Sequence, residues 1–309
     1  MPITQPHLLT TADLTVIVVT YNSAHCVAAL AQTLGTLPHV VVVDNGSADD
    51  TVATVAREMP NAKIIRNASN LGFGAANNLA LRQAQTSHAL LLNPDCIVER
   101  DSLERLLDVA EQYPEAGIIA PHLIRKGGRI EVSYRWPNTL WTSRGPAAEG
   151  ACCVGFVCGA AMLLNMEIMR EVGFFDETFF LYYEDEDLCQ RTFMQGRQVI
   201  LAPEVTITHL SRGSVRGPSP LGAEFTRGYH HAQSKLIYTG KHVGAREANA
   251  LRWKTLLLAL ATLLPRILLP QPRYLARLVG RISGLWKFKG VRAVTGKGQS
   301  AAASPARAK

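Results

Sequence analysis

The regular alternation of two sequence patterns in the first hundred residues constrains the fold more than any other feature. Apolar runs predict four strands, at residues 14–22, 39–47, 62–67 and 88–93. Segments with helical apolar spacing separate them, at residues 24–37, 49–59 and 74–85. Strands that alternate with helices over short connections form a parallel sheet covered by helices on both faces. We therefore predict an α/β fold with a mostly parallel central sheet flanked by helices.

Three of these strand patterns end in polar residues. They are Tyr21–Asn22, Asp44–Asn45–Gly46 and Asn93–Pro94–Asp95. Asn-Pro-Asp is also ordinary turn chemistry, so taken alone Asp95 could simply cap a strand. In open α/β sheets, however, ligands bind beyond the carboxyl ends of the strands. Three polar strand ends at one edge favour a binding site over a local cap.

Two common nucleotide-binding signatures are absent from the sequence. No GxGxxG follows the first predicted strand, and "NLGFGAAN" at residues 70–77 is a weak match to any phosphate-binding loop. No GxxxxGK[ST] occurs either. A dinucleotide-dependent oxidoreductase is therefore disfavoured.

The pattern changes beyond Pro121. Residues 127–141 are typical of a hairpin followed by an irregular loop, 154–165 of a strand, and 198–214 of a strand pair that ends at His209. The acids Glu184–Asp187 begin a helix that ends at Gly196. Acids at this position can serve only as capping and dipole partners. The preceding "LYY" would also place aromatic surface beside a carboxylate, which raises its pKa and improves it as a base.

The formal net charge of +7 is unevenly distributed. From Arg252 onward there are twelve Lys or Arg and no Asp or Glu, which leaves 20 basic and 25 acidic residues before it. The basic residues flank apolar runs instead of covering a folded face with aromatics between them, so a nucleic-acid partner is disfavoured. The longest apolar run, Leu256–Pro265, is too short to span a bilayer. We expect an interfacial membrane anchor, with a helical pair packed on the catalytic domain as the alternative.

The beginning of the chain and the cysteines bear on cellular location. The first thirteen residues have neither a basic nor an apolar region of the kind that directs secretion, so a cytosolic location is expected. The six cysteines show no CxxC spacing and no His/Cys cluster. Neither a zinc site nor a disulfide framework is indicated.

Seven segments in order resemble family 2 glycosyltransferases of the GT-A fold, especially the bacterial rhamnosyltransferase-like branch that builds cell-surface polysaccharides. The segments are "VIVVTYNS", "VVVDNGSADDT", "NLGFGAANN", "LLLNPD", "VGFVCGAAMLLN", "VGFFDETFFLYYEDEDLCQR" and "ITHLSRGS". The resemblance runs from about residue 14 to 240. It implies a catalytic domain at 1–245, with a nucleotide-binding half at about 14–121 and an acceptor half at about 122–245. A basic amphipathic membrane-associating segment at 246–294 and a disordered tail at 295–309 would follow.

The resemblance implies a nucleotide site at the polar strand ends. Asp44 would accept a hydrogen bond from the imide N–H of a uracil or thymine, and Thr20 and Tyr21 would line the base pocket. The residues implied to bind nucleotide are Thr20, Tyr21, Asn22, Asp44, Asn70, Gly72 and Asn93.

The resemblance also implies a metal and a catalytic base. Asp95 occupies the position of the DxD motif and would hold Mg²⁺ or Mn²⁺, which bridges the diphosphate, with His209 close to the metal. Asn93 replaces the first acid of that motif, so one anionic ligand is missing. Asp185 matches the base, and Glu184 would orient it or bind acceptor hydroxyls. Acceptor contacts are assigned to Trp136, Gly159 and Asp187, and core packing is the alternative for Trp136, as it is for Trp141.

These residues imply an inverting transfer of a sugar from a nucleoside-diphosphate sugar to a hydroxyl group. The branch implies dTDP-rhamnose as donor, and UDP-linked hexoses remain open. The acceptor would be a glycan or a polyprenyl-diphosphate-linked saccharide, met by a peripheral enzyme on the cytoplasmic face of the inner membrane. Two rival hypotheses are a catalytically silent nucleotide- or glycan-binding relative of the same fold and a sugar nucleotidyltransferase.

Overall fold

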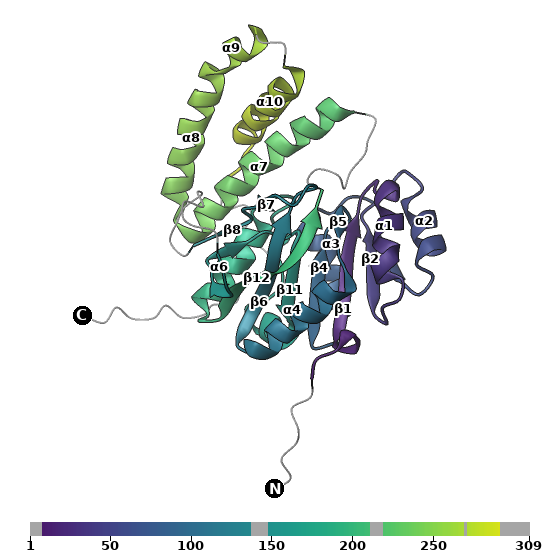
Figure 1. Ribbon diagram of the computed structural model, residues 1–309. Helices are drawn as coiled ribbons and strands as arrows, with labels where there is room; N and C mark the ends of the chain where they lie inside the picture. Colours follow the sequence, from purple (N-terminus) through teal and green to yellow (C-terminus); the bar gives the residue numbers. More distant parts are fainter. Residues whose placement is uncertain (1–7, 137–147, 211–218, 269–270, 291–309) are drawn as a thin grey trace, which may run out of the picture. The chain divides into compact units, whose positions relative to one another are not determined.

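A computed structural model describes residues 8–136, 148–210, 219–268 and 271–290 (Figure 1). The chain divides into two compact units. The first unit comprises Met1–Phe180 and Glu184–Pro218, and the second comprises Leu181–Tyr183 and Ser219–Lys309. The boundary predicted for the catalytic domain, at residue 245, lies within the second of these units. Trp141 and the predicted disordered tail at 295–309 lie outside the described residues.

The first unit is built on one large sheet with the order β3-β2-β1-β4-β11-β6-β12-β5, to which β7 adds beside β6 and β9 beside β12. A separate small sheet pairs β8 with β10. The strands are β1 (Leu14–Thr20), β2 (Val40–Asp44), β3 (Lys63–Arg66), β4 (His88–Leu92), β5 (Cys96–Ile97), β6 (Ala116–Ile124), β7 (Ile130–Glu131), β8 (Tyr134–Arg135), β9 (Cys152–Cys153), β10 (Phe156–Val157), β11 (Ala161–Asn165) and β12 (Gln198–His209).

The predicted parallel sheet is confirmed for the first four strands. β1 pairs in parallel with β2 and β4, and β2 with β3. Alternate residues of β1 enter two different cores, since Val16 and Val18 belong to one apolar cluster and Ile17 to the other. A strand buried on both faces is apolar throughout, which is why these strands appear as continuous apolar runs in the sequence.

The second half of the unit differs from the sequence prediction in two places. The strand pair predicted at 198–214 is one long strand, β12, whose register shifts between Ala202 and Thr206. Pro203 lies inside this interval and has no N–H to give to the ladder, so the strand bulges instead of turning back. In the region of the hairpin predicted at 127–141, β7 forms a short antiparallel hairpin with the end of β6, and β8 pairs with β10.

Helices cover both faces of the sheet in the first unit (Figure 1). They are α1 (Ala24–Leu34), α2 (Thr51–Glu58), α3 (Phe73–Leu81), α4 (Arg100–Gln112), α5 (Met166–Val172) and α6 (Glu184–Met194), and a 3₁₀ turn at Thr11–Asp13 precedes β1. The acidic run 184–187 forms the first turn of α6, as predicted.

The second unit consists of helices α7 (Pro220–His242), α8 (Ala245–Ala261), α9 (Leu263–Leu268) and α10 (Pro272–Trp286). Glycines let α7 and α10 approach closely, because a Cβ on Gly228 would lie 2.1 Å from the Arg277 carbonyl oxygen and one on Gly280 equally close to that of Phe225. Within the described residues, no helix combines the length and the apolar character needed to cross a membrane.

Candidate active site

The parallel register of β1 and β2 aligns Thr20 with Asp44 at the carboxyl edge of the sheet. Both side chains are buried. The Thr20 hydroxyl donates to Asp44 Oδ1 at 3.4 Å, and the Ser47 N–H donates to Asp44 Oδ2 at 3.1 Å. The Asp44 carboxylate is therefore held in one orientation by its own turn and by the neighbouring strand.

Asn45 organises the loop that carries two of the predicted nucleotide-binding residues. Its amide nitrogen donates to Asn70 Oδ1 at 2.9 Å and to the Gly72 carbonyl at 3.1 Å. Its Oδ1 accepts from the Leu71 N–H at 3.0 Å. Asn45 was noted at the polar edge but not assigned a role by sequence reasoning. The signal that could have indicated a role for Asn45 is its position directly after a fully buried strand.

Two glycines in this region are required by close backbone approaches. Gly46 has a φ of +82°, and a Cβ there would lie 2.9 Å from Cα of Ser69. Gly72 has a φ of +92°, and a Cβ there would lie 2.3 Å from the Phe180 carbonyl oxygen. Any side chain at either position would push the loop away from the strand ends.

The loop after β1 is tied to the loop after β2 through Asn22. The Asn22 N–H donates to the Ser47 hydroxyl at 2.9 Å, and Asn22 Oδ1 accepts from the Ala48 N–H at 2.8 Å. Asn22 adopts a left-handed conformation with φ of 52°, which asparagine tolerates better than most residues. Tyr21 precedes it and is half-buried. The structure thus brings Thr20, Asn22, Asp44, Asn70 and Gly72 to one edge.

Asp95 lies next to His209 because β5 pairs with the end of β12. His209 Nε2 is 3.6 Å from Asp95 Oδ1, and His209 Nδ1 is 3.3 Å from Glu131 Oε2. Asn93 donates its N–H to the Ala160 carbonyl at 2.8 Å, which fixes the start of the Asn-Pro-Asp turn. Sequence reasoning missed Glu131, which the short hairpin of β6 and β7 brings beside His209.

The charge state of His209 depends on these two carboxylates. Burial works to lower the pKa of the imidazole, but the hydrogen bond and charge of Asp95 and the charge of Glu131 raise it overall. Among the described residues, no three His, Cys, Asp or Glu side chains converge closely enough to hold a metal ion by themselves. A metal at this turn would need oxygen atoms from a bound ligand to complete its coordination.

Asp185 begins the acidic first turn of α6 and is held by backbone amides. The Gly159 N–H donates to Asp185 Oδ2 at 3.1 Å, and the Glu186 N–H donates to Oδ1 at 2.9 Å. A Cβ on Gly159 would lie 3.4 Å both from Cβ of Asp185 and from the Phe73 ring. Gly159, predicted to contact an acceptor, thus contacts the predicted base. Burial raises the pKa of Asp185 although these amides and Arg135 lower it.

Glu184 is the more deeply buried of the two neighbouring carboxyl groups. Its Oε2 has no hydrogen-bond partner in the described part of the chain. Burial, together with the charge of Asp185, raises the pKa of Glu184 well above its ordinary value. Burial and the neighbouring charge therefore favour the protonated form of Glu184, whereas the amide donors and Arg135 favour the ionised form of Asp185.

Two predicted acceptor residues are engaged elsewhere. Asp187 is completely buried in an ion pair with Arg191 at 2.8 Å, and Arg191 also donates to three carbonyl groups between residues 172 and 174. This contact gives Asp187 a structural role and leaves it out of the polar edge. Trp136 packs on the core and meets the Tyr134 ring edge-on at 5.7 Å. Sequence reasoning also missed Arg135, which pairs with Glu186 and lies 4.1 Å above the Phe156 ring.

The fold and its polar edge define a GT-A-type α/β protein, and comparison with known proteins places it more closely. The chain belongs to glycosyl transferase family 2, whose family model matches residues 15–173. Its fold is similar to that of the mannosyltransferase PcManGT from Pyrobaculum calidifontis, solved in complex with GDP-Man and Mn²⁺. The TM-score is 0.55 at 19% identity, over 89% of this chain and 87% of that one.

Sequence relatives lie in the rhamnosyltransferase-like branch. The N-acetylglucosaminyl-diphospho-decaprenol L-rhamnosyltransferase of Mycobacterium tuberculosis is 28% identical over 249 residues, which are 69% of this chain and 78% of that protein. The rhamnosyltransferase WbbL of Escherichia coli K12 is 26% identical over 159 residues, which are 45% of this chain and 60% of that protein. The predicted family and branch are confirmed.

Replacing Asn45 tests whether its amide holds the 67–72 loop. In Asn45→Asp, carboxylate oxygens would face Asn70 Oδ1 and the Gly72 carbonyl, which are acceptors. Leaving buried groups unmatched costs about 1–3 kcal/mol. If that cost appears as local opening, hydrogen exchange across 67–72 should accelerate roughly 5- to 150-fold. The control is Asn61→Asp, in an exposed turn. Unchanged exchange in Asn45→Asp would show that other contacts hold the loop.

Proposed function

We propose that this protein is an inverting glycosyltransferase that moves a sugar from a nucleoside-diphosphate donor to a lipid-linked saccharide. The observation that carries the proposal is the Asp185 carboxyl group, fixed by hydrogen bonds from the Gly159 and Glu186 amides beside the buried Glu184. A charged carboxylate with a raised pKa, held in one place, is suited to accept a proton from a hydroxyl group.

The strand ends of β1 and β2 supply the donor site in this proposal. Asp44 accepts the imide N–H of a uracil or thymine base, while Thr20 and the Ser47 amide keep its carboxylate oriented. The loop held by Asn45 presents Asn70 and Gly72 to the rest of the nucleotide. The rhamnosyltransferase relatives favour rhamnose as the transferred sugar. Cytosine and adenine lack the imide N–H, so we expect them to be excluded.

The turn at Asp95 suits a divalent cation in chemical terms. A buried carboxylate oxygen and an imidazole are ligands that Mn²⁺ accepts, and Mg²⁺ prefers oxygen ligands throughout. Asp95 would hold the ion, with His209 beside it and diphosphate oxygens completing the coordination. When bound, the ion neutralises charge on the departing diphosphate. The Mn²⁺ named with PcManGT and with GalNAc-T7, a second structure with a similar fold, supports this assignment.

The chemical step is a single displacement at the anomeric carbon of the donor sugar. Asp185 takes the proton from the acceptor hydroxyl as its oxygen forms the new bond to that carbon. The bond to the diphosphate breaks on the opposite side, and the diphosphate leaves with the electron pair. Because one displacement occurs, the configuration is inverted. The His209 side chain, 3.6 Å from Asp95, lies where it would help the ion to offset the charge that grows on the leaving group.

Replacing the base should separate catalysis from binding. In Asp185→Asn the side chain keeps its size but cannot accept the proton, so kcat should fall roughly 10²- to 10⁴-fold. The affinity for UDP or dTDP should change less than about threefold, because the residue does not touch the nucleotide in this proposal. Product formation by mass spectrometry and calorimetric titration with each nucleotide measure the two effects.

The pH profile gives an independent test of the same residue. Asp185 must be ionised to act, and burial raises its pKa above the ordinary 3.8. Transfer should therefore fall as the pH drops through this raised pKa, so the acidic limb of kcat/KM should lie above pH 3.8. The matched control is Asp108→Asn, which removes an exposed carboxylate of the same unit. Full activity of Asp185→Asn would overturn the base assignment.

Asp95→Ala should remove the metal-dependent part of donor binding. Wild-type protein should bind dTDP or UDP more tightly with Mn²⁺ than with EDTA, because the ion joins the carboxylate to the diphosphate. The variant should bind equally in both conditions. Asp44→Ala is the comparison, since it should weaken binding with and without the metal. If Mn²⁺ helps Asp95→Ala as much as wild type, the ion is held elsewhere.

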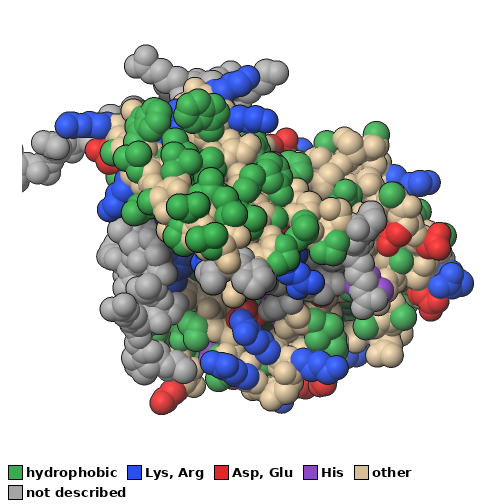
Figure 2. Space-filling model, turned by 90° about the horizontal axis from the view of Figure 1, so that it is seen from above, with side chains coloured by type: hydrophobic (Ala, Val, Ile, Leu, Met, Phe, Trp, Pro, Cys, Tyr) green, Lys and Arg blue, Asp and Glu red, His purple; other side chains and the backbone are tan. Residues whose placement is uncertain are grey.

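The second unit supports attachment to a membrane surface. Figure 2 shows hydrophobic side chains gathered on one face of the molecule, with Lys and Arg side chains around them. Large apolar side chains of α8 and α9 are exposed, among them Leu257 at 65% and Leu264 at 67%. Trp253, Leu257 and Leu260 lie three and four residues apart, so they share one side of α8. A cation-rich apolar face without acids from Arg252 onward complements anionic lipid headgroups.

Charges placed in this face should detach the protein from lipid. Wild type should float with vesicles that contain phosphatidylglycerol and less with pure phosphatidylcholine. Leu257→Glu combined with Leu264→Glu should lower the bound fraction at least about tenfold, since each leucine contributes roughly 1.5–3 kcal/mol when buried. Met194→Glu, at an exposed apolar residue of the first unit, is the control. If the double variant and wild type float equally, this face is not the one that binds the vesicles.

A further inference from the structure

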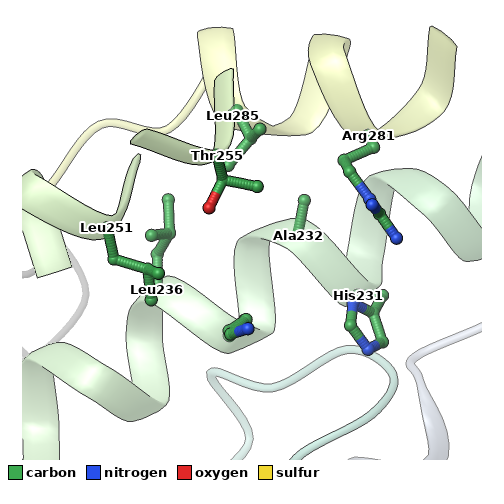
Figure 3. Close-up of a pocket in the computed structure, with 8 residues that line it drawn as sticks. His231, Ala232, Leu236, Leu251, Thr255, Arg281 and Leu285 are labelled. Atoms are coloured by element: carbon green, nitrogen blue, oxygen red, sulfur yellow. The ribbon is translucent and has the colours of Figure 1, made fainter. Parts of the chain in front are cut away.

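Three helices of the second unit enclose a cavity of about 90 Å³ (Figure 3). The polar residues that line it come from different helices: His231 and Lys235 from α7, Thr255 from α8, and Arg281 from α10. In Figure 3 the Arg281 side chain points towards His231. By the same measure, one water needs only on the order of 10–15 Å³, so the cavity has room for a group of several heavy atoms.

The charges at this cavity are all positive. Lys235 and Arg281 carry the cations, and no acidic residue lines the space. The nearby Glu224 is already neutralised by Arg227 at 2.9 Å and Arg277 at 2.5 Å. Among the described residues, no carboxylate forms an ion pair with Arg281. Cations around an enclosed space favour an anion inside it, because low local dielectric strengthens their attraction.

The pKa of His231 reflects the same positive charges. Burial and the charges of Arg281, Lys235 and Arg277 lower the pKa of His231 to about 4. Its ring also meets the Tyr182 and Tyr183 rings edge-on, at 5.6 Å and 5.4 Å. At neutral pH the imidazole is therefore uncharged and offers a single N–H to a ligand.

Part of the lining is apolar. It is formed by Leu236 on α7, Leu251 on α8 and Leu285 on α10. A cavity lined by both cations and leucines is matched to an anion that carries a hydrocarbon chain. Guanidinium and ammonium groups recognise phosphate oxygens well, and the Thr255 hydroxyl can donate to one more.

We propose that this cavity binds the phosphate or diphosphate group of an amphiphile, with the isoprenoid-linked acceptor as the source of that group. Lys235, Arg281 and Thr255 would hold the phosphate oxygens, and the leucines would contact the first carbons of the chain. The inference rests on the proposed function, because that function supplies a lipid-linked diphosphate as substrate. A membrane phospholipid carries the same chemistry and is the alternative source.

Titration of the full-length protein with defined probes tests the site. The probes are inorganic pyrophosphate, geranyl diphosphate, and vesicles of phosphatidylcholine with or without phosphatidylglycerol, all in EDTA. Binding is read from the imidazole NMR signals of His231, which reports this cavity and not the nucleotide site. Geranyl diphosphate should shift these signals with a Kd at least about tenfold below that of pyrophosphate. Its negative charge should also raise the pKa of His231 from about 4.

Substitutions identify the residues responsible. Arg281→Gln and Lys235→Gln should each lower the affinity for geranyl diphosphate about tenfold. Arg281→Lys keeps the positive charge and should retain part of the binding, which would show that the loss in Arg281→Gln is not due to misfolding. Arg273→Gln changes an exposed arginine of the same helix and should have no effect. For the pH measurement, the groups that face or adjoin His231 are Lys235, Arg277, Arg281, His230 and the two tyrosines.

The outcomes are separable. Equal affinity for pyrophosphate and geranyl diphosphate would show that the leucines do not contribute to binding. If no probe shifts the His231 signals, the proposed site is wrong. A shift with phosphatidylglycerol vesicles but not with geranyl diphosphate would overturn the isoprenoid source. Failure of the site would leave metal-dependent dTDP or UDP binding intact, whereas failure of the proposed function would appear as full activity in Asp185→Asn.

Discussion

The parallel pairing of β1 with its two neighbours is the constraint on which the first unit depends. The ladder aligns Thr20 with Asp44 on one side and Val18 with Leu92 on the other, so three strands end at the same edge. These strands are apolar on both faces, and polar loops can begin only where the strands leave the core. Asn45 lies at that edge, and its side-chain amide donates hydrogen bonds to the 67–72 loop, which fixes the loop beside the strand ends. The position of the donor site is therefore a consequence of strand register.

The candidate site keeps several carboxyl groups in or near the core, which costs solvation energy unless other groups replace the water. The replacement comes mostly from backbone amides. The Ser47 N–H donates a hydrogen bond to Asp44, and the Gly159 and Glu186 N–H groups donate to Asp185. Backbone donors are part of the fold and cannot rotate away, so these carboxylates stay oriented before any ligand arrives. Backbone groups of the turns and of the α6 N-terminus therefore fix the positions of the carboxylates before a ligand binds.

Much of this arrangement follows from local sequence patterns, and the remainder does not. Asp44 could be placed at the edge because it directly follows an apolar strand. Glu131 and Arg135 lie on two-residue strands that are too short to show a period. The β6–β7 hairpin places Glu131, and pairing with the more distant β10 places Arg135. Within the acidic run, composition cannot separate Asp185 from Asp187. The helix turns them to different sides, one held by the Gly159 amide and the other paired with Arg191 in the interior.

The second unit meets a different physical requirement. A lipid-linked saccharide combines a sugar that prefers water, a charged diphosphate and a chain that prefers hydrocarbon. Helix α8 is apolar on more than one side: Leu251 and Thr255, four residues apart, line the internal cavity, while Leu257 and Leu260 face outward. A helix of a water-exposed bundle would place polar residues on that outer side. Because α8 does not, its exposed leucines agree with the proposed contact between this unit and a lipid surface.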